Sequence, residues 1–138
     1  MWDWHQKADA QMSDHADTLF DVLGGTPGIA KVVDEMYARV LADEELAPFF
    51  KDTDLNRLKR MQTEFLSAMI DGPVRYSGAE LTEIHRGRGI ERRHFSQFCG
   101  HMLAALSAHG VAPNLVDQVL GRVAMYSDKI TGATNVDG

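Results

Sequence analysis

Apolar residues recur at intervals of three and four positions along most of the chain, which is the spacing of one face of an α-helix. The clearest stripe follows Thr26 and Pro27. Threonine is a favoured helix cap and proline suits the first helical position, so we predict that a helix begins there. The stripe consists of Ile29, Val32, Val33, Met36, Tyr37, Val40 and Leu41. Nowhere does the sequence sustain the alternation of apolar and polar residues that is typical of strands, and we therefore predict an all-α fold.

The same periodicity predicts further helices on both sides of this one. A short helix over 18–23 ends at a pair of glycines, and a tight turn of helix over 43–50 ends in two aromatic residues. Two long helices follow, over about 91–108 and about 113–130. Between the turn and these helices, Asp54 is a suitable cap for another helix. The apolar stripe of that helix consists of Leu55, Leu58, Met61, Phe65, Leu66 and Met69.

The chain divides into a polar leader and a region rich in helical stripes. Residues 1–17 are polar apart from isolated apolar side chains such as two tryptophans, and we expect them to be mobile or loosely helical. Residues 18–138 contain all the periodic stripes. A chain of 138 residues is long enough to bury a substantial core. We therefore expect 18–138 to form one domain.

Charge and cysteine content exclude several classes of function. The chain has 14 Lys and Arg against 20 Asp and Glu, a net charge of −6, which argues against nucleic acid or an anionic membrane as the main partner. No apolar run approaches the roughly 20 residues of a membrane helix, and the first residues lack the apolar core of a secretion signal. The single cysteine, Cys99, forms no internal disulfide. This fits a reducing compartment, and we expect a cytoplasmic protein.

One histidine is placed where it can act as a metal ligand. His85 lies between apolar neighbours in the stretch 81–90, on a predicted short helix that Gly87 and Gly89 end. One imidazole nitrogen can then point into the interior, while a backbone carbonyl holds the other and tunes the ring as a ligand. A lone histidine on an apolar face is more often a core or rim residue. This stretch alone leaves both interpretations open.

Two polar residues lie on otherwise apolar helix faces. Tyr37 falls in the middle of the first stripe, and Gln62 falls inside the stripe that follows Asp54. Burying either one without a hydrogen bond costs roughly 1–3 kcal/mol, so each needs a polar partner. They either bond each other or a backbone carbonyl, or they face something polar in the interior. Together with His85 they form a set that suits a haem with a diatomic ligand on its open side.

Other chemistries fit the sequence less well. His94 and His101 are seven residues apart, which separates them by about 10.5 Å along a helix, too far to chelate one zinc ion. The glycine-rich stretch 24–28 lacks the Lys-Ser/Thr ending of a phosphate loop, and there is no Cys-x-x-Cys-His motif for haem attachment. Met61 is either core packing or a thioether that approaches a bound metal. Its spacing does not decide between the two.

Taken together, these residues resemble a known family. From Thr18 to about Ile130 the chain is similar to group I truncated haemoglobins, in both the order and the spacing of its motifs. The matching stretches are Leu-Gly-Gly (23–25), Tyr-Ala-Arg-Val-Leu (37–41), Phe-Phe (49–50), Gln-Thr-Glu-Phe (62–65), Tyr-Ser-Gly (76–78) and His-Arg-Gly-Arg-Gly-Ile (85–90). The resemblance implies a two-over-two helical sandwich that encloses haem b.

The resemblance also implies a role for individual side chains. His85 would be the proximal ligand of the haem iron, and Tyr37 and Gln62 would hold bound O2 from the distal side. Phe50 would pack on the porphyrin near its entrance. Leu58 would take the position that a distal histidine has in longer globins, and an apolar side chain there neither bonds nor ligates. The other side chains expected around the haem are Arg57, Met61, Phe65, Tyr76 and Phe95.

Two positions depart from the family pattern. Leu66 stands where close members often carry a phenylalanine that gates an apolar tunnel to the haem, and leucine is smaller. Met61 stands where members often carry a cationic or ligating side chain, and a thioether cannot pair with a haem propionate. That pairing would pass to Arg57 or Tyr76.

The implied function is the binding of O2, NO and CO at ferrous haem iron. The activity that the resemblance implies is nitric oxide dioxygenation to nitrate, for which an external and unidentified reductase returns ferric iron to the ferrous state. The alternative is a module that stores or senses O2 or NO without turnover. A third interpretation is a helical bundle with no cofactor.

Overall fold

The computed structural model describes residues 18–73 and 85–131, and within these ranges the chain forms helices and no strand. This confirms the all-α prediction. The predictions made for the leader 1–17, for Tyr76 and for residues 81–84 lie outside the described residues. The elements in chain order are α2 (Leu19–Val22), α3 (Gly25–Leu41), the 3-10 helix η1 (Ala47–Phe50), α4 (Leu55–Met69), α6 (Arg92–Ala108), α7 (Pro113–Ala124) and α8 (Ser127–Thr131).

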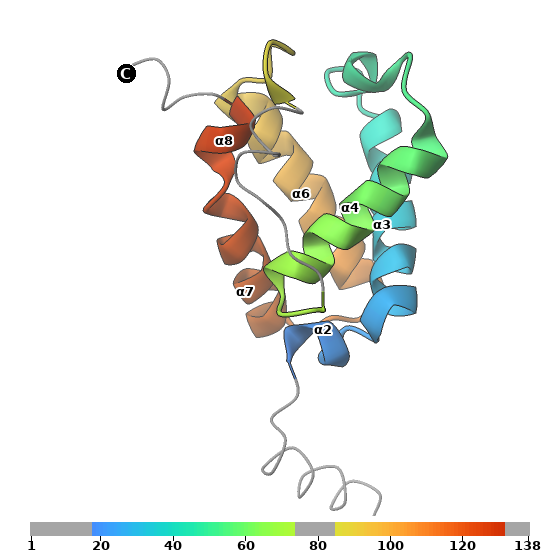
Figure 1. The fold of residues 1–138 in the computed structure, drawn as a ribbon, viewed down its shortest axis with the longest axis vertical. Coiled ribbons are helices and arrows are strands. Elements are labelled where there is room, and N and C mark those ends of the chain that lie inside the picture. Colours follow the sequence, from blue (N-terminus) through green and yellow to red (C-terminus); the bar gives the residue numbers. More distant parts are fainter. Residues whose placement is uncertain (1–17, 74–84, 132–138) are drawn as a thin grey trace, which may run out of the picture.

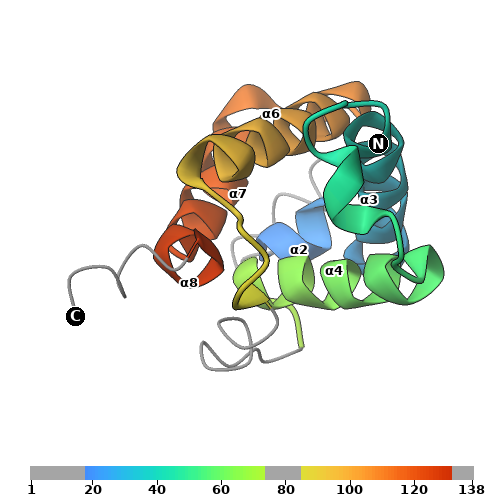
Figure 2. The same cartoon turned by 90° about the horizontal axis from the view of Figure 1, so that it is seen from above.

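The helices pack as two crossed pairs. Helix α3 packs chiefly against α4 and α6, and α6 also packs against α7 and α8. Seen from above, α4 and α6 lie on opposite sides of the molecule, with α3 along one flank and α7 and α8 along the other (Figure 2). This is the arrangement expected of a two-over-two sandwich. The core between the pairs includes Val33, Met36, Val40 and Met102, each fully buried.

Helix α3 begins earlier than its cap signals predict. Its cap is Gly24, with φ of +96°, and the helix starts at Gly25 rather than at Pro27. The left-handed glycine lets the chain turn directly from α2 into α3. Pro27 then falls in the first turn, where backbone N–H groups have no intrahelical partner. Gly28 is required in that turn, because a Cβ there would overlap the carbonyl oxygen of Leu23.

The two ends of α4 are fixed by polar side chains. At its start Asp54 acts as the predicted cap, since its Oδ1 accepts a hydrogen bond from the Arg57 backbone N–H at 3.2 Å. At its end Arg122 of α7 donates from Nη1 to the Met69 carbonyl at 3.1 Å and to Asp71 Oδ2 at 2.8 Å. Helix α7 therefore holds the last turn of α4 and sets the angle between the two pairs.

The predicted last helix over 113–130 is interrupted, and this prediction was wrong. Helix α7 ends at Ala124, and Met125 and Tyr126 then donate their N–H groups to carbonyls three residues back. Met125 is 79% exposed, whereas the Tyr126 ring packs edge-on against Phe65 of α4 at a centroid distance of 5.8 Å. The change of direction brings Tyr126 onto α4, which a helical pattern cannot indicate. Leu41, the last residue of the predicted α3 stripe, is also exposed.

No helix within the described ranges is long and apolar enough to cross a membrane. Figure 1 shows the longest ones, α3 and α6, lying side by side within the packed body of the protein. Their outward faces carry charged side chains such as Glu35 and Arg93.

Candidate functional site

A cavity of about 400 Å³ opens between the two helix pairs. Its walls come from α3, η1, α4, the turn that begins at His85, α6, α7 and α8. The predicted site residues that line it are Tyr37, Phe50, Arg57, Leu58, Met61, Gln62, Phe65, His85 and Phe95. Only Tyr76 of the predicted set is not placed, because it lies outside the described residues. The structure therefore brings together residues that are far apart in the sequence.

One wall of the cavity carries a buried hydroxyl. Tyr37 is 1% exposed, and its hydroxyl lies 3.4 Å from Gln62 Oε1, to which it donates. The two residues thus bond each other, which is one of the possibilities that the sequence left open. The distance is long for a hydrogen bond with an O–H donor. Burial raises the pKa of Tyr37 far above its ordinary value, because the apolar surroundings disfavour the charged phenolate. The hydroxyl has one hydrogen, which serves either Gln62 Oε1 or an acceptor bound in the cavity.

Aromatic rings hold Tyr37 in this position. Its ring meets Phe50 edge-on at a centroid distance of 5.6 Å and Phe98 at 6.0 Å. Phe50 comes from η1 and Phe98 from α6, so the tyrosine of α3 is clamped from two sides. Such edge-to-face pairs favour a fixed ring orientation. The hydroxyl is therefore aimed into the cavity by packing as well as by its hydrogen bond.

His85 lies on the cavity wall and is half-buried. The chain leaves the helical conformation directly after it, with φ of +73° at Gly87 and +75° at Gly89. These left-handed glycines end the helix as the sequence predicts. The turn that they make also brings Arg88 to the cavity. The imidazole and a guanidinium thus reach the same space from one short segment.

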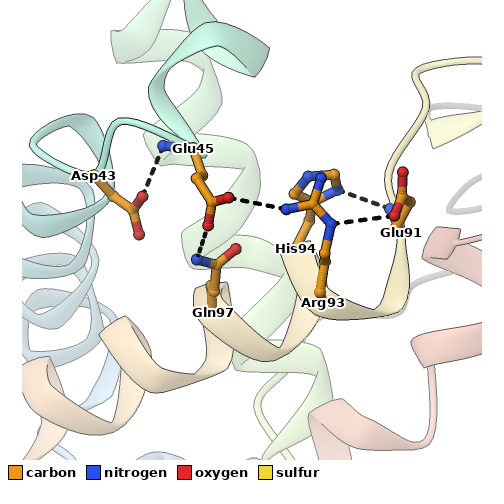
Figure 3. A network of polar contacts seen from close by, with 6 residues as sticks. All are labelled: Asp43, Glu45, Glu91, Arg93, His94 and Gln97. Atoms are coloured by element: carbon orange, nitrogen blue, oxygen red, sulfur yellow. Dashed lines mark hydrogen bonds and ion pairs between the residues drawn. The ribbon is translucent and has the colours of Figure 1, made fainter.

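The second histidine on the cavity wall is engaged in capping a helix. His94 is buried, and its Nδ1 accepts the Glu91 backbone N–H at 2.9 Å in a capping box at the start of α6 (Figure 3). A neutral ring whose Nδ1 accepts must carry its proton on Nε2. Neither nitrogen then offers a lone pair to a metal. Only His85 is suited to be an axial ligand among the histidines of this wall.

The remaining metal alternatives have no support in the described part of the chain. No group of three or more His, Cys, Asp or Glu side chains there is arranged to hold a metal ion. His101 Nε2 lies 2.8 Å from Asp43 Oδ2, and His94 Nδ1 accepts the Glu91 backbone N–H. Each of these two histidines thus has its own partner within the fold.

Leu66 does not line the cavity, although the family pattern places a gating residue at this position. It is buried in the core at 3% exposure, while its neighbour Phe65 reaches the cavity. The bulky ring on this turn of α4 is thus supplied by Phe65.

Several cavity residues escaped the sequence analysis as site residues. They are Leu46, Phe49, Thr53, Asp54, Arg88, Ile90, His94, Phe98, Val123 and Ile130. Phe98 carried a signal, because it lies on the inward stripe of α6, and Arg88 lies within the matched motif around His85. Val123 lies within α7, whereas Ile130 reaches the cavity from α8, after α7 has ended at Ala124. No local sequence pattern predicts that the helix is interrupted there.

The chemistry of the walls fits a haem. Aromatic and aliphatic side chains supply apolar faces for a macrocycle, and Arg57 and Arg88 supply positive charge for its two carboxylates. His85 supplies a nitrogen ligand for iron, and Tyr37 supplies a hydrogen-bond donor inside the cavity. An apolar cavity with these few polar groups is what haem and a small gas ligand require.

Comparisons with known proteins agree with this site. Residues 18–132 match the family described as Bacterial-like globin. The Group 1 truncated hemoglobin GlbN of Mycolicibacterium paratuberculosis is 42% identical over 113 residues, which cover 82% of this chain and 83% of the relative. GlbN of a Nostoc species is 34% identical, over 77% of this chain and 90% of the relative.

Solved structures agree as well. The crystal structure of truncated hemoglobin from Tetrahymena pyriformis in its Fe(III) form matches with a TM-score of 0.77 and 30% identity, over 83% of this chain and 97% of that one. The similarity confirms the two-over-two sandwich. Globins hold haem with its iron and bind small gaseous ligands there. With its buried Tyr37 and cavity-lining His85, the chain belongs to the bacterial-like globins, as a group 1 truncated haemoglobin.

Proposed function

We propose that this protein binds O2 at ferrous haem and uses it to convert nitric oxide to nitrate in a reducing cytoplasm. The observation that carries the proposal is the buried, protonated hydroxyl of Tyr37 in the cavity wall, paired with Gln62. Hydrogen-bond donors inside an apolar cavity stabilise negative charge that develops on a bound molecule. Negative charge of this kind develops on O2 when it is activated, so a buried donor favours a reaction of O2. A protein that only stores O2 requires no more than moderate affinity for it.

Individual residues of the cavity would each hold one part of the haem. His85 would hold the iron through one imidazole nitrogen. Arg57 and Arg88 would neutralise the propionates at the cavity walls. When bound, ferrous haem supplies reversible O2 binding and the electron that the reaction of O2 with NO requires.

The chain's own residues then control charge and water. Tyr37 would turn its single hydroxyl hydrogen from Gln62 Oε1 to a bound ligand, and the Gln62 amide nitrogen is a further donor. Phe50, Leu58 and Phe65 line the cavity with carbon and exclude water from the ligand. A dry site strengthens each hydrogen bond to a charged acceptor and limits proton entry.

The test is the consumption of NO over repeated cycles. The purified protein is loaded with haem, reduced, exposed to air, and given NO in pulses with NADH and a purified flavin-dependent reductase. We expect nitrate to exceed the haem concentration many-fold, with ferrous oxygenated spectra restored between pulses. A protein that forms only one nitrate per haem, although the reductase returns its iron to the ferrous state, would contradict turnover. It would favour an O2- or NO-binding module instead.

A first prediction concerns Met61, which we expect to pack rather than ligate. It lies on the same face of α4 as the cavity residues Leu58 and Phe65, where a flexible side chain fills space between larger groups. Met61→Leu should therefore leave the absorption spectrum of the ligand-free ferrous protein unchanged. A low-spin, six-coordinate spectrum in the parent that disappears in Met61→Leu would contradict this prediction.

A further inference from the structure

Side chains spaced four residues apart on α6 meet two carboxylates of the turn before η1. Arg93 Nη1 donates to Glu45 Oε2 at 3.0 Å, and the Gln97 amide nitrogen donates to Glu45 Oε1 (Figure 3). One turn further along, His101 Nε2 lies 2.8 Å from Asp43 Oδ2. A spacing of four residues places all three side chains on one face of the helix. We call this set, comprising Asp43, Glu45, Arg93, Gln97 and His101, the α6 ladder.

Both sides of the ladder are held in place by further contacts. Glu91 Oε1 accepts from Arg93 Nε at 3.2 Å, which orients the guanidinium toward Glu45 (Figure 3). Asp43 Oδ1 accepts the Glu45 backbone N–H at 2.9 Å. Hydrogen bonds from the His101 side chain and from the backbone hold the pKa of Asp43 below its ordinary value. Asp43 is thus a carboxylate at neutral pH, as the ladder requires.

The turn that the ladder holds leads into one wall of the cavity. Leu46, Phe49 and Phe50 follow Glu45 directly and line the cavity. Phe50 contacts the Tyr37 ring at a centroid distance of 5.6 Å, and Phe49 contacts the His94 ring at 4.8 Å. Helix η1 itself has four residues and is a 3-10 helix, so its own hydrogen bonds provide little rigidity. Contacts from neighbouring helices therefore hold these rings, from α3 through Tyr37 and from α6 through His94 and the ladder.

Gln97 indicates that the ladder is more than surface packing. A carboxylate only accepts hydrogen bonds, so the amide nitrogen of Gln97 must face Glu45. The other end of the side chain, Oε1, is then buried and has no hydrogen-bond partner among the described residues. A buried unpaired oxygen destabilises a fold. Gln97 thus keeps its amide nitrogen on Glu45 although its own oxygen stays unpaired, which fits a contact that serves to position Glu45.

We propose that the α6 ladder positions η1 against the cavity and thereby sets how long the protein retains its haem. The inference rests on the proposed haem site and adds residues outside the cavity to it. Asp43, Glu45 and their partners act through Phe50, which follows Glu45 in the chain and contacts the Tyr37 ring. They are positioning residues, and none of the five lines the cavity.

The test measures haem transfer from the ferric holoprotein to an excess of apomyoglobin, followed by the change of the Soret band. Glu45→Gln removes the charge that Arg93 meets and keeps the size of the side chain. The matched control is Glu35→Gln, which removes an ion pair of 2.8 Å with Arg39 within α3 alone. We expect haem loss to be roughly 1.5- to 5-fold faster in Glu45→Gln, the range of a solvent-exposed pair, and unchanged in the control.

Salt dependence and a double variant sharpen the test. In the parent, haem loss should accelerate as salt rises to about 1 M, where charges are screened beyond roughly 3 Å. Glu45→Gln should show a weaker dependence than the parent, and the remainder belongs to the charge pairs that this variant keeps, such as Asp43 with His101. Because Glu45 and Arg93 act as one pair, Glu45→Gln with Arg93→Gln should be no faster than the faster single variant.

Hydrogen exchange separates positioning from general destabilisation. In holoprotein Glu45→Gln, amide exchange should rise over residues 46–51 and stay at parental rates in α3 and α7. Exchange that rises equally in all helices would overturn the proposal, as would haem loss at the rate of the control. A parent chain that acquires no Soret band would contradict the haem site itself, and the proposal with it. Normal haem binding with unaltered loss in Glu45→Gln would contradict the ladder alone.

Discussion

His85→Ala is expected to abolish stable haem binding. Of the two histidines that line the described cavity, His94 uses Nδ1 to cap α6 and carries its proton on Nε2, which leaves His85 as the candidate axial ligand. Removing the axial ligand should weaken haem retention by more than the roughly 10- to 100-fold that outer-shell changes cost at metal sites. Haem transfer to apomyoglobin and the spectrum of the ferrous, ligand-free protein measure the effect. Free imidazole should restore part of the binding, since the cavity created by alanine can admit it.

The matched control for this variant is His94→Gln. An amide can still accept the Glu91 N–H near the α6 terminus, so we expect this variant to keep a ferrous spectrum close to that of the parent. If His85→Ala retained an unchanged ferrous spectrum while His94→Gln lost it, the proximal assignment would pass to His94. The two variants together therefore decide between the two histidines of the cavity wall.

Tyr37→Phe is expected to speed O2 release by roughly tenfold or more. A net hydrogen bond contributes about 0.5–1.5 kcal/mol, more when the acceptor carries charge, and about 1.4 kcal/mol is a factor of ten. The O2 ligand accepts hydrogen bonds, whereas CO hardly does, so CO release should change little. Stopped-flow dissociation of both gases from the ferrous protein measures the contrast. Oxidation of the oxygenated protein should accelerate in parallel, because loosely held O2 leaves more readily as superoxide.

Two further variants test whether the effect belongs to the distal pair. Tyr126→Phe also removes a tyrosine hydroxyl, but Tyr126 packs on Phe65 outside the set of cavity-lining residues, so O2 release should stay at the parental rate. Gln62→Ala should speed O2 release by a smaller factor in the Tyr37→Phe background than in the parent, because Tyr37 and Gln62 bond each other and share one ligand. O2 release from Tyr37→Phe within twofold of the parent would refute the distal-pair mechanism.

Local sequence determined most of the helices. The α3 stripe, the Asp54 cap and the glycines after His85 each act within a few residues, through periodicity, a side chain bonded to a nearby N–H, or left-handed backbone. These signals predicted where α4 and α6 begin and that His85 ends a helix. They misplaced the start of α3, because the left-handed Gly24 makes the cap without a side chain.

The motifs also predicted the site, because residues on the inner faces of packed helices converge. Tyr37 and Gln62 stood out as polar residues in apolar stripes. The hydrogen bond between them is one of the possibilities that the sequence left open. What the sequence could not provide was the distance of 3.4 Å between them, or the burial that raises the pKa of Tyr37. Both depend on how α4 crosses α3.

Only the tertiary structure decided which distant segments close the cavity. After α7 ends at Ala124, Tyr126 packs on Phe65, and Ile130 of α8 reaches the cavity wall. The α6 ladder joins residues 48 to 58 positions apart. The sequence displays the charges of Glu45 and Arg93, but only the fold brings the turn before η1 to α6 and so pairs them. Contacts at such separation leave no periodic trace, because helical periodicity records only neighbours within one or two turns.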